Sequence, residues 1–398
     1  MSGDLGPDMR LEAGNLEVDA EKCERVKAEM RQVWRYEPVD HIPVLIDIGP
    51  ECGVTVRDAL LDTEAWFSSA VRRIERSLRV LPDDYVPWVG PPWAAFHTVP
   101  VMLGAQLWWE KDPDAWPAIR SPVVTEIDQV YELRDPDPYS SGMAPEILRR
   151  LELATECFSS EVSLVGVDMM SPLGDVLGLM DQTLFFVSLK SHPEAIHHAC
   201  EVVTRAQMAL QDAAVAVVGT SDRFAALSNW PIWRPEEGKA LVTDDIASLL
   251  GPAVFERFDR PYGDRLLARH GGGLRHVCGP HPSLGTYMRG DQMVHGLNCS
   301  FRYSRDSLRG MKEEFGRFAE ESLGRRGHLE VMFERQVPLG EMVTGFRQLA
   351  EELAPDVVAI PYCQVPADGS VSDDEITRFY FAMRAVAEDY AHSMRWRA

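Results

Sequence analysis

HLEVMFERQVPLGEMVTGFRQLAEELAPDVVAIPY, residues 328–362, is the stretch that decides the fold. An apolar run at 328–333 comes first, and a helix-period stretch at 342–353 follows it. A second apolar run covers 357–362. Two strands joined by such a helix run parallel to each other, because the crossover returns the chain to the edge from which it started. The stretch therefore predicts one strand–helix–strand unit of a parallel sheet.

The same alternation extends toward the N-terminus. Six further apolar runs have the length of strands, at 41–48, 84–89, 162–168, 224–228, 273–278 and 292–297. Helix-period stretches such as 194–218 separate most of them. Eight strands that alternate with helices predict an α/β fold, a single (β/α)8 TIM barrel over residues 41–398.

Residues 1–40 are predicted to precede the barrel as an N-terminal helical extension. The first part is an acidic leader, and AEKCERVKAEMRQVWR at 20–35 has the pattern of a charged amphipathic helix. Two aromatic, proline-rich segments, 88–116 and 171–186, are expected to form loops over the barrel mouth.

The charge of the chain limits its partners. Sixty-two acidic against forty basic residues give a formal net charge of −22, so nucleic acid and anionic membrane surfaces are not expected to bind. The acidic N-terminus does not resemble a signal peptide, and no apolar run reaches the length of a membrane helix. We expect a soluble, cytoplasmic protein whose seven cysteines are reduced thiols.

A candidate metal site lies at the predicted strand ends. In the sequence His276-Val277-Cys278, the imidazole and the thiol project to the same side of a strand. Cys363 directly follows the last predicted strand, so all three side chains are expected on one rim of the barrel. One imidazole and two thiolates suit Zn²⁺ and leave a fourth position open, as in catalytic zinc sites.

Other assignments of these residues remain open. His276 is alternatively a hydrogen-bonded histidine, with both cysteines packed as small apolar groups. Cys299 follows another predicted strand and is a rival ligand to Cys363. Glu330 and Glu334 are candidates for a fourth, carboxylate ligand.

Further polar and aromatic residues are candidates for substrate binding. Asp47 and Asp168 end predicted strands, where a carboxylate orients a substrate or caps the following helix. His97, Trp230 and Tyr262 fall in predicted mouth loops, where rings supply contact area for a planar or methylated group.

Several segments carry a family resemblance. FDRPY at 258–262 and GGGLRHVCG at 271–279 are the most characteristic, together with RYEPVDHIP at 35–43, DMMSPLGDVLG at 168–178, TDDIASLLGP at 243–252 and IPYCQVPADGSVSDDEI at 360–376. These segments resemble the uroporphyrinogen decarboxylase (URO-D) superfamily, and more specifically its zinc-dependent methyltransferases, which take a methyl group from a methylated corrinoid protein. The resemblance covers most of the chain after about residue 25 and implies the TIM barrel fold.

The resemblance implies a ligand set and a reaction. In those methyltransferases zinc is held by the histidine and cysteine of an H-x-C-G motif and by a cysteine near the last strand. By this resemblance, the ligands in this chain would be His276, Cys278 and Cys363. The expected function is transfer of a methyl group between a corrinoid, such as methylcobalamin or a corrinoid carried by a partner protein, and a small acceptor such as a thiol. The chain lacks a D-x-H-x-x-G corrinoid-ligating motif of its own.

Three alternatives accompany this expectation. The first is zinc-assisted demethylation of a methoxy or methylamine substrate onto corrinoid. The second is a decarboxylase-like lyase, although DIGPECG at 47–53 stands where such decarboxylases carry an arginine-rich segment for carboxylates. The third is a barrel without catalytic activity that serves in binding or assembly.

Overall fold

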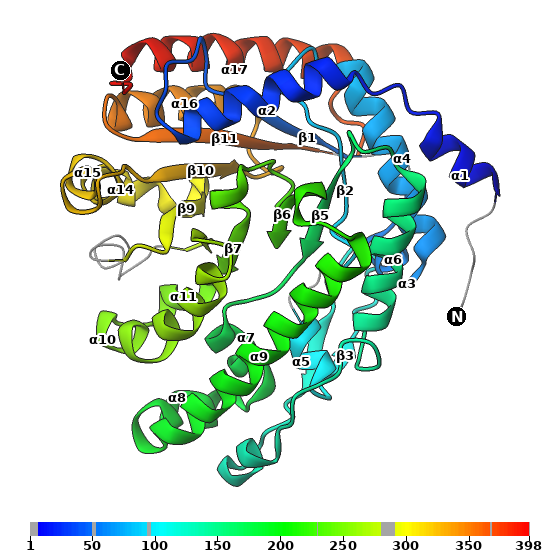
Figure 1. Cartoon of the computed structure of the whole chain (residues 1–398), viewed down its shortest axis with the longest axis vertical. Helices are drawn as coiled ribbons and strands as arrows, with labels where there is room; N and C mark the ends of the chain where they lie inside the picture. Colours follow the sequence, from blue (N-terminus) through cyan, green and yellow to red (C-terminus); the bar gives the residue numbers. More distant parts are fainter. Residues whose placement is uncertain are drawn as a thin grey trace.

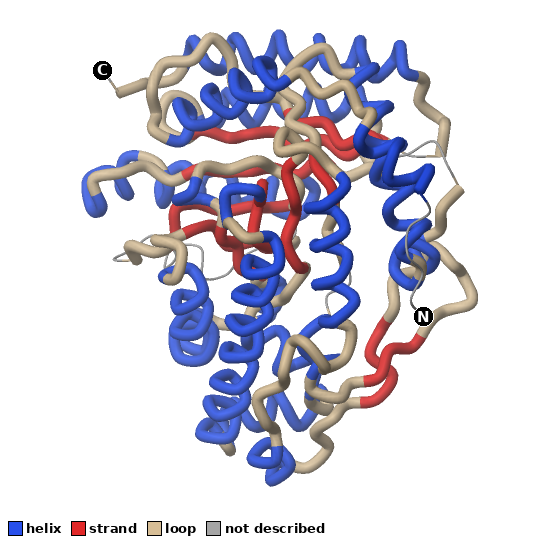
Figure 2. The backbone as a smooth tube through the Cα atoms, turned by 45° about the vertical axis from the view of Figure 1, so that its right-hand side comes forward, coloured by secondary structure: helices blue, strands red, loops and turns tan. Residues whose placement is uncertain are grey.

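Parallel strands form the centre of the molecule, and helices lie around them (Figures 1 and 2). The computed structural model describes residues 7–49, 53–93, 97–228, 230–279, 291–366 and 368–397. The parallel strands of this part of the chain are β1 (Leu45–Ile48), β2 (Trp88–Val89), β5 (Ser163–Val167), β6 (Phe224–Ser228), β7 (Ala240–Thr243), β8 (Gly273–Val277), β9 (Val294–Ser300), β10 (His328–Phe333) and β11 (Val358–Val365). A short antiparallel hairpin, β3 (Gln106–Trp108) and β4 (Ala118–Ser121), stands apart from them.

The parallel strands pair in two groups. Six of them form a sheet in the order β1-β11-β10-β9-β8-β7, and β2, β5 and β6 form a second sheet. One backbone hydrogen bond of 3.0 Å, from the amide of Leu227 to the carbonyl of Lys239, links the regions of β6 and β7. The α/β class and the curled parallel sheet are confirmed, whereas a closed eight-stranded barrel is not, because the pairings between described residues leave two sheets.

One strand was not predicted. β7 follows β6 after only a short 3-10 turn, Glu236–Gly238, and without the α-helix that a βα alternation requires. The prediction therefore placed one strand where the structure has two. The region is important for the site, since the residues directly after β7 lie beside β8.

The limits of four strands also differ from the prediction. Only 88–89 of the run 84–89 pairs as a strand, because Pro87 has no amide hydrogen to donate and Asp84 has a left-handed backbone with φ of 57°. β1 is shorter than predicted, whereas β9 continues to Ser300 and β11 to Val365. Cys299 and Cys363 consequently lie within strands rather than after them.

Long helices connect and cover the strands. Those of the first half are α2 (Ala20–Trp34), α3 (Val56–Leu61), α4 (Thr63–Val80), α5 (Thr98–Met102), α6 (Ala144–Cys157), α7 (Pro172–Leu179), α8 (Gln182–Ser191) and α9 (Pro193–Val218). Those of the second half are α10 (Pro252–Val254), α11 (Arg260–Ala268), α13 (Phe301–Ser304), α14 (Leu308–Phe315), α15 (Arg317–Leu323), α16 (Leu339–Leu353) and α17 (Asp373–Ser393). None of the described helices is long and apolar enough to cross a membrane.

The N-terminal extension packs on the strands. α2 forms as predicted, with Asp19 as its N-cap, and the Trp34 ring at its end stacks on His328 of β10 at 4.5 Å. Residues 7–14, predicted as part of a loose leader, instead form a helix, α1 (Pro7–Gly14). Arg10 of α1 pairs with Glu156 of α6 at 3.2 Å.

The register of the six-stranded sheet separates its two faces. Paired residues of neighbouring strands project to the same face. One row contains Thr243, His276, Asn298 and Glu330. The next residues along β8, β9 and β10 are Val277, Cys299 and Val331, which are buried at 1% exposure or less and project to the opposite face. The polar row defines the face on which the candidate site is built.

Candidate metal centre

His276 lies near the C-terminal end of β8, and a buried chain of hydrogen bonds fixes its ring. Its Nδ1 lies 2.7 Å from Oδ1 of Asn298. The Asn298 amide nitrogen donates to Glu330 at 2.8 Å, so its oxygen must face the histidine. The imidazole therefore carries its proton on Nδ1 and leaves the Nε2 lone pair available for a metal ion.

Glu330 is itself held by a buried arginine. Nε and Nη2 of Arg234 donate to the two carboxylate oxygens of Glu330 at 2.7 and 2.6 Å. Both side chains are fully buried, and their opposite charges compensate each other. Glu330, predicted as a fourth ligand, instead lies behind His276 and orients it through Asn298.

Two further donors lie beside Nε2 of His276. Sγ of Cys278 is 3.0 Å away and Oδ1 of Asp245 is 3.6 Å away. Asp245 Oδ1 also accepts a hydrogen bond of 2.7 Å from the backbone amide of Cys278. The three donor atoms lie within 4.8 Å of one another, which makes them one of two such metal-capable groups among the described residues.

The donor set fits zinc. One imidazole nitrogen, one thiol sulfur and one carboxylate oxygen are all common zinc ligands, and three of them leave a position for a substrate. Burial, with the nearby Asp245 carboxylate, raises the pKa of the Cys278 thiol well above its ordinary value. A thiolate at this position therefore needs a neighbouring positive charge, which a bound zinc ion would supply.

Asp245 was not predicted as a ligand. It begins the 3-10 turn Asp245–Leu249, two residues after the end of β7, and β7 pairs directly with β8. The signal in the sequence was the Asp-Asp pair after Thr243, at the end of a short apolar run. Because that run was not recognised as a strand, the carboxylate was not placed beside His276.

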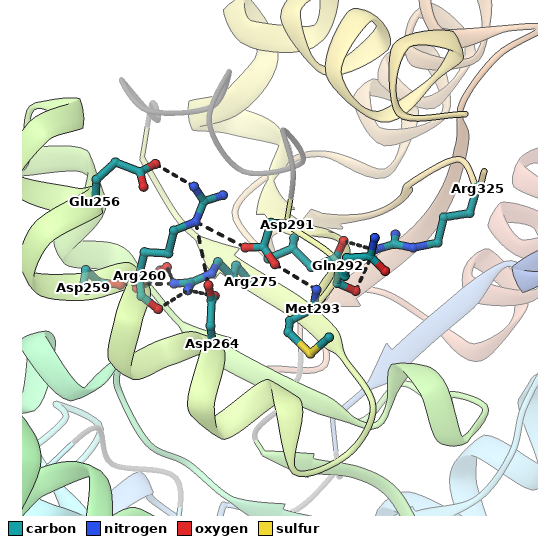
Figure 3. Close-up of polar contacts among 11 residues, drawn as sticks. Glu256, Asp259, Arg260, Asp264, Arg275, Asp291, Gln292, Met293 and Arg325 are labelled. Atoms are coloured by element: carbon teal, nitrogen blue, oxygen red, sulfur yellow. Dashed lines mark hydrogen bonds and ion pairs between the residues drawn. The ribbon is translucent and has the colours of Figure 1, made fainter. Parts of the chain in front are cut away.

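Arg275, the residue before His276 on β8, forms ion pairs with several carboxylates, and Figure 3 shows it beside Asp259 and Asp264. Arg275 is fully buried and contacts the carboxylates of Asp244, Asp259 at 3.1 Å and Asp264 at 2.6 Å. The backbone amide of Asp244 also donates to the carbonyl of His276 at 2.7 Å. Arg275 thus fixes the turn that presents Asp245 to the histidine.

Cys363 and Cys299 are not in the three-residue group. Cys363 pairs with Phe333 and Ile46, two buried apolar residues, and so shares their face of the sheet. Cys299 pairs with Val331, also on that face. Burial raises the pKa of both thiols, that of Cys299 to about 12. Both cysteines therefore have the surroundings of packed, uncharged thiols.

Glu334 lies just beyond β10. Its Oε1 accepts a hydrogen bond from the hydroxyl of Ser300. Among the described residues its Oε2 is buried without a hydrogen-bond partner. It is not part of the group formed by His276, Cys278 and Asp245.

Of the predicted substrate residues, Trp230 contacts His276, and Asp47 is connected to Trp230 through Tyr362. The Trp230 ring is 4.8 Å from His276 and 6.0 Å from Tyr362, centroid to centroid. The Tyr362 hydroxyl in turn donates to Oδ2 of Asp47 at 2.9 Å. Trp230 and Tyr362 thus form an aromatic wall on the same face of the sheet as the histidine, with Asp47 behind it.

The other three predicted substrate residues belong to other elements and have other contacts. Tyr262 belongs to α11, where its hydroxyl bonds to Nδ1 of His197 at 2.9 Å, in contact with α9 rather than in a mouth loop. Asp168 is buried after β5, and its backbone carbonyl accepts from Thr98 at 3.2 Å. His97 precedes α5, and burial lowers its pKa.

A pocket of about 650 Å³ adjoins the site. Its wall includes the polar residues Asp245 and His97. Apolar residues of the hairpin and of α7, such as Ile119 and Leu177, also line it. Met170, another residue of the wall, forms a backbone β-bridge with Thr243, two residues before Asp245. This bridge connects the pocket wall to the segment that carries Asp245. Of the three donor residues, Asp245 is the one that lines this pocket.

Comparisons with known proteins are consistent with this fold. Residues 93–220 match the family model described as uroporphyrinogen decarboxylase (URO-D). A solved structure described as a methyltransferase from Methanosarcina mazei superposes with a TM-score of 0.65 at 18% sequence identity, over 92% of this chain and 98% of that one. No curated protein matches the sequence. The family match ends before β6 and does not include His276, Cys278 or Asp245.

Proposed function

We propose that this chain is a zinc-dependent methyltransferase of the URO-D superfamily, which moves a methyl group between a corrinoid on a partner protein and a small thiol. The observation that carries the proposal is the convergence of Nε2 of His276, Sγ of Cys278 and Oδ1 of Asp245 within 4.8 Å, next to a pocket. The URO-D match and the similarity in fold to a methyltransferase support the choice of reaction.

Two ligand sets are considered for the proposed site. Both contain His276 and Cys278, and the third ligand is either Asp245 or Cys363. Asp245 needs no rearrangement, because its oxygen already lies 3.6 Å from Nε2 of His276. Cys363 would have to turn to the other face of β11, since Tyr362, its neighbour, lies on the face of Trp230 and His276. The geometry favours Asp245.

Zinc, when bound, would keep a substrate thiol deprotonated at neutral pH. The protein's own groups have separate tasks. Asn298 and Glu330 hold the His276 ring so that Nε2 lies beside Cys278 and Asp245. The Asp245 carboxylate accepts from the amide of Cys278 and so fixes the turn that carries the sulfur. The Trp230 ring covers His276 and reduces the access of water to it.

Metal analysis of the purified protein and three variants tests the ligand set. We expect about one zinc per chain in the wild type, as for a three-ligand catalytic site. Cys278→Ser and Asp245→Asn should lose the metal, and Cys363→Ser should keep it. Loss in Cys363→Ser with retention in Asp245→Asn would assign the third ligand to the cysteine. A wild type purified without chelators that holds no stoichiometric metal would contradict the proposed mechanism and favour a barrel without this chemistry.

The reaction is tested with methylcobalamin and a small thiol as substrates. Zinc-loaded wild type should form the methyl thioether together with cob(I)alamin, and His276→Ala should not. The opposite direction, demethylation of a methoxy compound or a methylamine, is tested by supplying cob(I)alamin and following the formation of methylcobalamin. If the zinc-loaded enzyme forms methylcobalamin from those donors and does not methylate the thiol, the substrate in this proposal changes from a thiol to a methoxy compound or a methylamine.

A further inference from the structure

The pocket beside Asp245 has a composition that limits which thiol it accepts. The inference rests on the proposed function, because it concerns the acceptor of the same zinc site. Most of the wall is apolar and comes from the hairpin, α5 and α7, with Pro100, Ile119 and Leu177 as examples. The volume of about 650 Å³ is sufficient for a small organic molecule.

The charged groups on this wall are all acidic. Asp175, Asp181 and Asp245 line the pocket, and no lysine or arginine is among its described lining residues. Sites that bind carboxylate, sulfonate or phosphate groups in proteins present arginine or lysine to them. The wall therefore lacks the usual partner of an anionic ligand.

The three carboxyl groups of the wall differ in their burial and in their hydrogen bonds. Asp181 is exposed and caps α8 through a hydrogen bond of 3.0 Å from the amide of Leu184. Asp175 is buried, burial raises its pKa well above the ordinary value, and its Oδ2 accepts a hydrogen bond from Gln207 at 2.6 Å. Asp245 lies at the metal group. An anion in the pocket would meet at least the Asp181 charge without a compensating cation on the described wall.

The charge of the whole chain acts in the same direction. A net charge of −22 produces a negative potential over much of the surface and lowers the local concentration of anions. We infer that the acceptor is a small thiol whose remaining part is uncharged and largely apolar, and that thiols carrying a carboxylate or sulfonate are poor ligands of this pocket.

Cobalt-substituted protein provides a direct binding assay. Co²⁺ occupies zinc sites and gives visible and near-ultraviolet absorption bands that change when a thiolate binds. The probes are 2-mercaptoethanol and thioglycolate, two thiols of similar size that differ by one carboxylate. We expect the neutral thiol to bind the wild type about tenfold more tightly than the anionic one, because the described wall offers the carboxylate no cation in place of its water shell.

Two substitutions change the wall without touching the metal group. Ile119→Arg places a cation in the pocket and should raise the affinity for thioglycolate relative to 2-mercaptoethanol by about tenfold. Ile119→Met is the matched control, with similar length and no charge, and should leave the ratio unchanged. Thr183 is an exposed lining residue, so Thr183→Lys, with Thr183→Gln as control, repeats the test where folding is not at risk.

The outcomes separate this inference from the proposed function. If no cobalt binds, the metal site itself is wrong. If cobalt binds and wild type prefers thioglycolate, or if neither cationic variant changes the ratio, the metal site stands and the inferred acceptor is wrong. The inference is supported if the wild type prefers 2-mercaptoethanol and if Ile119→Arg or Thr183→Lys weakens this preference. Both neutral control variants should then keep the wild-type ratio.

Discussion

Asn298 is the residue on which the orientation of His276 depends. It accepts from Nδ1 of His276 and donates to Glu330, so it transmits the position of a buried ion pair to the candidate ligand. Asn298→Ala should lower zinc affinity by about 10- to 100-fold, the usual effect of removing a group that orients a ligand. Competition with a chromophoric chelator measures this, and circular dichroism confirms the fold. An unchanged zinc affinity in a folded variant would show that His276 needs no such support.

Some residues of the candidate site could be predicted from the sequence, and others could not. His276 and Cys278 were predicted because a spacing of two on a strand places both side chains on one side, and the structure has them 3.0 Å apart. The hydrogen bond between Asn298 and His276 was not predictable, since it depends on the register of β9 against β8. Asp245 was missed for the same kind of reason, because its neighbour β7 was not recognised.

At the scale of elements, Arg275 joins β8 to Asp244, directly after β7, and to Asp264 of α11. Figure 3 shows the pair with Asp264. Removing a fully buried arginine leaves three carboxylates without their main cation. Arg275→Met should therefore lower the free energy of unfolding by about 3–5 kcal/mol. Denaturant unfolding of the two proteins measures the difference.

A surface ion pair provides the control for this variant. Arg317 and Glu321 pair at 2.8 Å on the exposed face of α15, where solvent screens the interaction. Arg317→Met should leave the unfolding midpoint nearly unchanged. If Arg275→Met behaves like Arg317→Met, the cluster around Arg275 does not hold these elements together.

The contact between α2 and β10 makes stability depend on pH. Burial lowers the pKa of His328 to about 3, whereas an unfolded histidine has a pKa near 6.5. The unfolded chain therefore takes up the proton first, and stability falls as the pH drops from about 6.5 toward about 3, by at most about 1.4 kcal/mol per pH unit.

His328→Phe isolates this effect, because the ring on Trp34 is kept and the titrating group is removed. Unfolding free energies measured at several pH values between about 4 and 7 should fall less steeply toward acid in the variant than in the wild type. Equal slopes would mean that His328 is not the group responsible.

The sequence predicted most of the strands, and its errors have local causes. Period and length located β5, β6, β8 and β10 to within one residue at either end, because their apolar runs stop at polar or turn residues. β11 extends past the predicted end, since Gln364 continues the pairing with β1 despite its polar side chain. β7 was missed because no helix separates it from β6. Pattern alone does not show which of two adjacent runs joins which sheet.

At the scale of the whole molecule, the arrangement of strands was less predictable than their existence. Eight alternating runs indicated a closed barrel, whereas the parallel strands among the described residues form a six-stranded and a three-stranded sheet. Closure depends on pairing between strands distant in sequence, such as β1 with β11, and on short strands such as β2. Neither leaves a local signal in a single sequence, whereas the parallel direction follows from the crossover helices alone.

The net charge of −22 is a property of the whole molecule, and it opposes the compact state through self-repulsion. Raising NaCl from about 20 to about 200 mM shortens the screening length from about 20 to about 7 Å, so repulsion between distant carboxylates weakens. We expect the melting temperature at neutral pH to rise by about 1–3 °C. Near the sequence pI of 4.9 the net charge is close to zero, and the same salt step should have much less effect. A melting temperature that falls with salt at neutral pH would mean that attractive ion pairs, rather than the excess of acidic residues, dominate the electrostatics of this fold.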